Sequence, residues 1–145
     1  MKDRIITLER SFDAPVTLVW RALTEKDLMK LWYFDLAEFT PVEGFSFEFF
    51  GGHEDGIQYK HICEITEVIK NQKLTYSWRY EGYPGISFVT FELFPENAGT
   101  CLRLTHTGID SFPADVPDFA IHNFEEGWNQ IINHSLTDFL TTHNH

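Results

Sequence analysis

The stretch NFEEGWNQIINHSLTDFL, residues 123–140, carries the longest helical pattern in the chain. Its apolar residues recur at spacings of three and four, which places them on one face of a helix, and polar residues fill the opposite face. The pattern predicts a long amphipathic helix whose apolar stripe needs a covering surface. The apolar positions are Phe124, Trp128, Ile131, Ile132, Leu136, Phe139 and Leu140.

The rest of the chain predicts the surface that covers this stripe. An apolar segment predicts a first strand, two short helical patterns follow it, and from residue 44 onward apolar and polar residues alternate as they do in strands. Consecutive strands joined by short turns form antiparallel sheets. We therefore predict an α+β fold in which a curved antiparallel sheet packs against the C-terminal helix. The strands are expected over 4–12, 44–52, 57–69, 73–80, 86–95 and 100–108, and the short helices over 15–24 and 25–32.

Length and composition indicate a single domain that spans residues 1–145. A chain of this size buries roughly 70% of its unfolded surface, which is enough for a hydrophobic core. Aromatic residues make up 16% of the sequence, with 14 Phe, 5 Tyr and 4 Trp. So many rings predict either a bulky, filled core or a cavity lined by aromatic side chains.

The formal net charge of −11 bears on partners and location. Nucleic acids and anionic lipid surfaces are bound through clustered Lys and Arg, and the sequence has no such cluster. No apolar run approaches 18 residues, and the N-terminal MKDRIITLER lacks the apolar core of a signal peptide. We therefore expect no nucleic-acid binding, no membrane insertion, and a cytoplasmic protein in which Cys63 and Cys101 are reduced.

Common catalytic and ligand-binding motifs are missing from the sequence. It has no HExxH or CxxC spacing for a metal, no GxSxG for a nucleophile, and no P-loop or GxGxxG for a phosphate. His143 and His145 lie in the tail, where they would hold a metal only adventitiously. We therefore assign no metal, cofactor or catalytic residue, and favour a protein without enzymatic activity.

Several segments, taken in order, resemble one known family. They are FDAPVTLVWRALTEKDLMKLW at 12–32, GFSF at 44–47, LTYSW at 74–78, VTFEL at 89–93, GTCLRLTHTG at 99–108, and Gly127-Trp128. Together they resemble the START-related, Bet v 1-like (SRPBCC) superfamily, and within it the activator of Hsp90 ATPase homologue 1-like (AHSA1-like) domains. One departure is Glu43-Gly44, where these domains usually have a Gly-Gly pair.

The resemblance implies a helix-grip fold: a seven-stranded antiparallel sheet around a long C-terminal helix, often with a hydrophobic cavity between them. It does not imply one function. Relatives include lipid carriers, plant hormone receptors, polyketide cyclases and chaperone-stimulating domains, so that function has to be argued from the site.

Two small residues interrupt the predicted helix. Gly127 costs about 1 kcal/mol relative to alanine in a helix interior. We interpret it as a packing notch that lets the sheet approach beside Trp128, and the alternative is that it leaves room for a ligand. Ser135 lies within the apolar stripe, where its hydroxyl could face a ligand or bond back to the carbonyl of Ile131.

Two histidines lie on predicted strand faces rich in aromatic residues. If these faces point toward the helix, His61 and His106 supply the few polar groups that orient a ligand in an apolar pocket. The alternative for each is a structural histidine with its hydrogen bonds satisfied. The predicted cavity lining is Trp32, Phe47, Tyr59, His61, Trp78, Phe88, His106, Trp128 and Ser135.

Three functions follow from this arrangement. We favour a protein that binds a small apolar or aromatic molecule in an internal cavity. The second is a protein-interaction module related to Hsp90 activators. The resemblance counts against this function, because it covers one domain, whereas the proteins that stimulate Hsp90 carry a further N-terminal domain. The third is a cyclase- or hydrolase-like enzyme that uses His61 or His106. Homodimer formation is left open.

Overall fold

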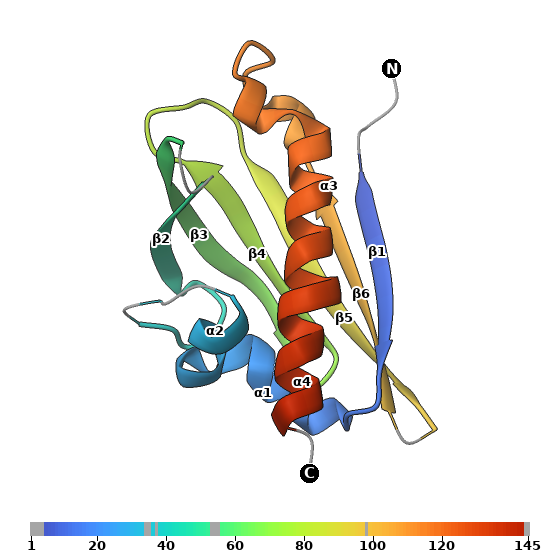
Figure 1. Cartoon of the computed structure of the whole chain (residues 1–145). Coiled ribbons are helices and arrows are strands. Elements are labelled where there is room, and N and C mark those ends of the chain that lie inside the picture. Colours follow the sequence, from blue (N-terminus) through green and yellow to red (C-terminus); the bar gives the residue numbers. More distant parts are fainter. Residues whose placement is uncertain (1–4, 34–35, 37, 53–55, 98, 144–145) are drawn as a thin grey trace.

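The computed structural model of the protein describes residues 5–33, 36, 38–52, 56–97 and 99–143. Its elements follow the predicted order of a strand, two short helices, a run of strands and a long C-terminal helix (Figure 1). His145 lies outside the described residues. The strands are β1 (Ile6–Phe12), β2 (Ser46–Gly52), β3 (Gln58–Ile69), β4 (Lys73–Tyr80), β5 (Ser87–Glu96) and β6 (Gly99–Thr107), and the helical segments are α1 (Val16–Thr24), α2 (Lys26–Trp32), η1 (Ile109–Ser111), η2 (Pro117–Phe119), α3 (Ile121–Gln130), η3 (Ile131–Leu136) and α4 (Thr137–His143).

The strands form one antiparallel sheet in the order β1-β6-β5-β4-β3-β2. Neighbours from β2 to β6 are consecutive in the chain, whereas β1 pairs with the last strand, from Ile6 opposite His106 to Phe12 opposite Thr100. This confirms the predicted α+β fold and its antiparallel sheet. The described part of the chain contains six strands, one fewer than the seven that the family resemblance implies.

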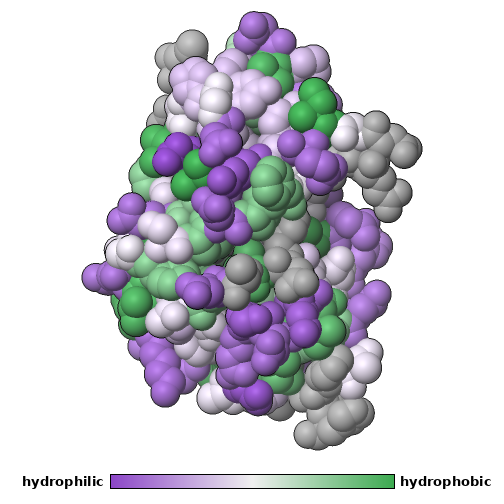
Figure 2. Space-filling model, turned by 90° about the vertical axis from the view of Figure 1, so that its left-hand side faces the viewer, coloured by the Kyte–Doolittle hydropathy of each residue, from purple (hydrophilic) through white to green (hydrophobic). Residues whose placement is uncertain are grey.

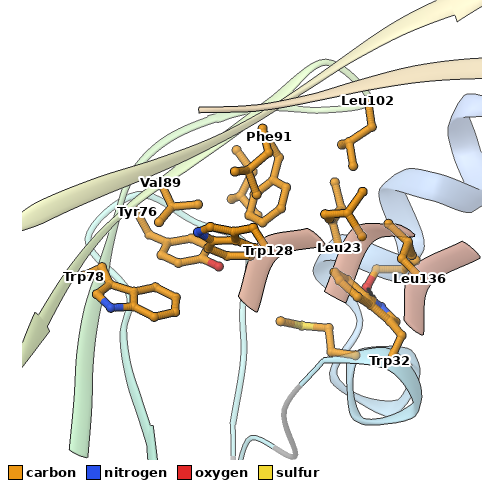
Figure 3. Close-up of a cluster of buried hydrophobic side chains, with 14 of the residues drawn as sticks. Leu23, Trp32, Tyr76, Trp78, Val89, Phe91, Leu102, Trp128 and Leu136 are labelled. Carbon is orange, nitrogen blue, oxygen red and sulfur yellow. Dashed lines mark hydrogen bonds between the residues drawn. The ribbon is translucent and has the colours of Figure 1, made fainter. Parts of the chain in front are cut away.

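The C-terminal helix crosses one face of this sheet (Figure 1). Alternation in β4 directs Leu74, Tyr76, Trp78 and Tyr80 to the buried side. Figure 3 shows Trp128 of the helix among Tyr76, Trp78 and Phe91 of the sheet, with Leu136 farther along the same helix. Trp128 is only 2% exposed, so the helix supplies its largest side chain to the centre of the core.

The helix changes its hydrogen-bonding pattern midway along its length. Between α3 and α4 the six residues of η3 form a π-helix, in which backbone bonds span five residues. The buried residues recur at every fourth position, and in an α-helix such a series drifts by about 40° at each step because 3.6 residues make one turn. The wider π turn reduces this drift and keeps the stripe on the sheet. The series is Phe124, Trp128, Ile132, Leu136 and Leu140.

The two short helices pack at the end of the sheet where α4 ends (Figure 1). Trp32 of α2 is buried, and its indole Nε1–H donates to the backbone oxygen of Ala22 at 2.9 Å. Thr24 Oγ1 donates to the backbone oxygen of Trp20 at 2.7 Å. These bonds satisfy buried polar groups at this end of the sheet.

Two surface features complete the description. On the face that Figure 2 shows, where the β2 edge of the sheet is turned toward the viewer, hydrophobic side chains are mixed with hydrophilic ones. Phe50 of β2 is 65% exposed, and Ile57, the residue directly before β3, is 62% exposed.

None of the described helices combines the length and apolar character needed to cross a membrane.

Candidate functional site

A pocket of about 590 Å³ opens between α3, strands β3 and β4, and the short helix η2. Strand alternation places four side chains of β3 and β4 on its floor, namely Tyr59, His61, Trp78 and Tyr80. Gly51 at the end of β2 also contributes. The remaining lining residues are Asp118 and Phe119 of η2, and Asn123, Phe124, Glu126, Gly127, Trp128, Gln130 and Ile131 from the C-terminal helix.

Aromatic rings form most of the pocket wall and hold one another in place. The rings of Phe119 and Tyr80 stack with centroids 4.5 Å apart, and Phe119 also contacts Tyr59 at 5.1 Å. Trp78 and Trp128 lie 5.6 Å apart across the sheet–helix interface. These ring contacts pack the side chains of the pocket wall against one another.

Gly127 faces this pocket. A Cβ atom built on Gly127 meets no other atom within 4 Å, so no strand or loop backbone approaches the helix at this position. The interpretation of Gly127 as a packing notch is therefore wrong, because no neighbouring backbone occupies the space beside it. The alternative interpretation, room beside the helix, agrees with its place in the pocket lining.

His61 is a buried, neutral group at the pocket floor. Its Nδ1 lies 2.9 Å from the backbone oxygen of Tyr59, and the ring stacks on Phe49 with centroids 4.5 Å apart. Burial lowers the pKa of His61 to about 4, although contacts with the Tyr59 and Phe49 carbonyls oppose this shift. At neutral pH the imidazole is uncharged, and such a low pKa makes it a weak general base.

His106 is fully buried and belongs to a hydrogen-bonded chain that joins helix and sheet. The indole Nε1–H of Trp128 donates to His106 Nδ1 at 3.0 Å, so the proton of the neutral ring resides on Nε2. Nε2–H then donates to Ser87 Oγ at 2.8 Å, and the Ser87 hydroxyl donates to the backbone oxygen of Trp78 at 2.9 Å. Burial lowers the pKa of His106 to about 3. The ring nitrogens of His106, the indole N–H of Trp128 and the Ser87 hydroxyl all take part in these structural hydrogen bonds.

A tyrosine–aspartate hydrogen bond joins β3 to η2 beside the pocket. The hydroxyl of Tyr59 donates to Asp118 Oδ2 at 2.6 Å. This bond is the main reason why the pKa of Tyr59 is raised to about 12. Asn123 Nδ2 donates to the backbone oxygen of Pro117 at 2.8 Å, so η2 is tied both to the sheet and to α3.

Four of the nine residues predicted to line a cavity surround this pocket: Tyr59, His61, Trp78 and Trp128. The other five lie elsewhere in the described structure. His106 is not in the pocket lining and belongs to the hydrogen-bonded series that joins Trp128 to Ser87. Ser135 is half-buried in the π-helical segment, where the helical wheel of a regular α-helix no longer applies.

The remaining three differ in burial. Trp32 and Phe47 are buried in the core, where Phe47 contacts Tyr76 with ring centroids 5.1 Å apart. Phe88 is 38% exposed, because alternation in β5 turns Ser87 and Val89 inward and Phe88 outward.

Sequence reasoning missed several lining residues. Phe124 belongs to the predicted helical stripe, and Tyr80 shares a strand face with Trp78. Periodicity therefore predicts that both side chains are buried, but it does not show at which end of the sheet the pocket forms. Asp118 and Phe119 come from residues 111–119, whose two prolines and acidic residues are typical of a connecting loop or a helix entry, and which have no periodicity to indicate that they fold over the pocket.

The pocket has the volume of a small-molecule site, but its polar groups are not arranged for an obvious reaction. Its buried hydroxyls and rings bond to one another, as in the 2.9 Å bond from Trp78 Nε1–H to the Tyr80 hydroxyl. Among the described residues, no group of three or more His, Cys, Asp or Glu side chains is arranged to hold a metal ion.

Solved structures share this architecture. Protein MLL2253 from Mesorhizobium loti is 29% identical, with a TM-score of 0.81 over 98% of this chain and 100% of that chain. CalU16 from Micromonospora echinospora is 26% identical, with a TM-score of 0.69 over 97% and 75% of the two chains. DynU16, a protein in the dynemicin biosynthetic locus, is 21% identical, with a TM-score of 0.78 over 99% of this chain and 49% of that chain.

A comparison with curated proteins finds no match. The model of one protein family, described as activator of Hsp90 ATPase homolog 1-like protein, matches residues 13–141. This range runs from the residue after β1 to α4 and includes every described residue that lines the pocket. The chain therefore belongs to the family of activator of Hsp90 ATPase homolog 1-like proteins.

Proposed function

We propose that this protein binds a small apolar or aromatic molecule in the pocket between α3 and strands β3 and β4, without catalysing a reaction. The observation that carries the proposal is the pocket itself, of about 590 Å³ and walled by aromatic side chains. Sites for small molecules are typically concave, apolar and between about 300 and 1,000 Å³ in volume.

Gly127 supports this function over that of a filled core. A helix of this length gains stability from alanine at such a position, yet the chain has a glycine where a side chain would project into the pocket. The cost of the glycine is explained if the space beside it is used. The same space would be unnecessary for a domain that acts only through its outer surface.

The absence of a catalytic role rests on the two histidines. His106 is engaged on both ring nitrogens, and the pKa of His61 is lowered to about 4. A general base works best with a pKa near the working pH, so neither ring is suited to proton abstraction at neutral pH.

We place the protein in the cytoplasm, since both cysteines are free thiols.

Ligand binding can be tested with a neutral aromatic probe, 2-(2-naphthyl)ethanol, titrated while the fluorescence of the pocket tryptophans is followed. In Gly127→Leu the new side chain projects into the pocket, so we expect the affinity to fall by about tenfold or more. Glu125→Leu places the same side chain on the solvent-facing side of α3, outside the pocket lining, and should bind like the wild type.

Thermal unfolding of both variants confirms that each is folded before the titrations are compared. Equal affinity in all three proteins, or no binding to the folded wild type, would contradict the proposed function.

A further inference from the structure

The described residues that line the pocket carry full charges of one sign only. Asp118 and Glu126 are the only residues with full charges among the described residues that line it, and no Lys or Arg is among them. His61 on the pocket floor is uncharged at neutral pH, because burial lowers its pKa to about 4. Among the described residues that line the pocket, a ligand therefore meets two negative charges and no positive one.

The closest basic residues along the floor strands belong to the opposite face of the sheet. Lys60 follows Tyr59 directly, and alternation turns its side chain outward, where the ammonium lies 3.2 Å from Glu48 and 3.4 Å from Glu81. Arg79, between Trp78 and Tyr80, is exposed for the same reason. A carboxylate or phosphate in the pocket would thus find no neutralising cation on the described part of these two strands.

The two acidic side chains come from different elements and line the same pocket. Asp118 is half-buried on η2, and the Tyr59 hydroxyl fixes its carboxylate with a 2.6 Å hydrogen bond. Glu126 is exposed on α3, one residue before Gly127. A carboxylate held in place at the edge of an apolar pocket attracts a cation more strongly than one free in water, because the local dielectric constant is lower.

The floor reinforces this preference. A cation over the face of Tyr or Trp is attracted by the negative charge of the ring face. The pocket presents Tyr59, Tyr80 and Trp78 from the sheet and Trp128 from the helix. An organic cation can therefore place its apolar body among the rings and its charge where both the carboxylates and a neighbouring ring attract it.

We infer that the pocket selects organic cations: molecules with an apolar body of about two fused rings and a protonated amine held between Asp118 and Glu126. This inference rests on the function proposed above and adds the chemical class of the ligand. Carboxylates of similar shape, such as fatty or aromatic acids, are excluded by repulsion from the same two side chains.

A matched series of three probes tests the inference at neutral pH and low salt. 2-(2-Naphthyl)ethylamine is cationic, 2-(2-naphthyl)ethanol is neutral and 2-naphthylacetate is anionic, while the naphthyl body is the same. We expect the amine to bind about tenfold more tightly than the alcohol, and the acetate to bind most weakly. High salt should shrink the preference for the amine and leave the alcohol unaffected.

Isosteric variants identify the side chains responsible. Asp118→Asn and Glu126→Gln remove one charge each, and Asn can still accept the hydrogen bond from Tyr59. Each should reduce the amine-to-alcohol affinity ratio by about two- to fivefold. Glu125→Gln removes a charge from the same helix outside the pocket lining and should leave the ratio unchanged.

The outcomes separate the two proposals. If the alcohol binds but the amine binds no better, or if the Asp118 and Glu126 variants keep the wild-type ratio, the inference about charge is overturned and the pocket remains. If none of the three probes binds to the folded protein, the proposed function fails, and the inference fails with it.

Discussion

At the residue scale, Gly127 and Trp128 are neighbours on α3 with opposite surroundings. Trp128 is buried among Trp78, Phe91 and His106, whereas Gly127 is exposed to the pocket. The sequence predicted the burial of Trp128, because its place on the apolar stripe determines the face. The role of Gly127 could not be predicted, since a helical wheel gives a direction but not the distance to the nearest backbone.

Gly127→Ala tests this assignment through stability. Alanine adds a methyl group to open space and improves helix propensity, so we expect the free energy of unfolding to rise by up to about 1 kcal/mol. Urea denaturation measures the change. Gly108→Ala is the contrasting variant, because Gly108 has a φ of 84° and a Cβ there would lie 2.8 Å from the Ile86 oxygen; it should lose stability. A loss of stability in Gly127→Ala would contradict the assignment of open space beside Gly127 and support its interpretation as a packing notch.

The two buried histidines predict how stability depends on pH. Their pKa values in the folded protein, about 4 for His61 and about 3 for His106, lie below the ordinary value of 6.5. Between these limits the unfolded chain takes up protons that the folded chain does not. The free energy of unfolding should therefore fall as the pH is lowered from about 6.5 to about 4, by up to about 1.4 kcal/mol per pH unit for each histidine.

Urea denaturation at a series of pH values measures this slope, and His61→Gln should reduce it by the share of one histidine. A free energy of unfolding that stays constant across the window, or a His61→Gln slope equal to that of the wild type, would show that the rings are not held neutral by burial.

At the element scale, strands were predicted better than the segment that closes the pocket. The alternation in residues 73–80 defined both the limits and the buried face of β4. The start of the C-terminal helix was less sharply predicted, because the sequence allows a start at Asn123 or nearer to Pro117, and α3 begins between them at Ile121. The π turn has no local sequence signal. The short helix η2 carries Asp118 and Phe119 into the site through tertiary contacts with β3 and β4, which no local pattern encodes.

Tyr59→Phe tests whether η2 is held over the pocket by its hydrogen bond to the sheet. The variant keeps the ring and removes the hydroxyl that donates to Asp118. We expect a loss of about 1–2 kcal/mol and faster amide hydrogen exchange in residues 109–120. Tyr83→Phe is the matched control, since the Tyr83 ring also packs on Phe119, at 5.1 Å. Equal exchange rates in the two variants would contradict a role for the Tyr59 hydroxyl.

At the scale of the whole molecule, the family resemblance predicted the architecture and left the chemistry open. The sheet that grips the helix follows from an amphipathic stripe and a run of alternating strands, each of which needs the other to bury its apolar face. The place where the sheet and the C-terminal helix separate to form a pocket depends on the side-chain volumes along the entire interface between them. This is why Trp32, Phe47 and Phe88 were grouped with pocket residues although the structure places them elsewhere.

Native mass spectrometry of gently purified protein tests the central claim, an open and functional pocket, most directly. We predict a retained small molecule, present from purification or acquired from the naphthyl amine, that is lost on denaturation. It should also be lost in Gly127→Leu and kept in Glu125→Leu. A wild-type protein that shows only the mass of the folded chain, both as purified and after incubation with the naphthyl amine and alcohol, would contradict the account.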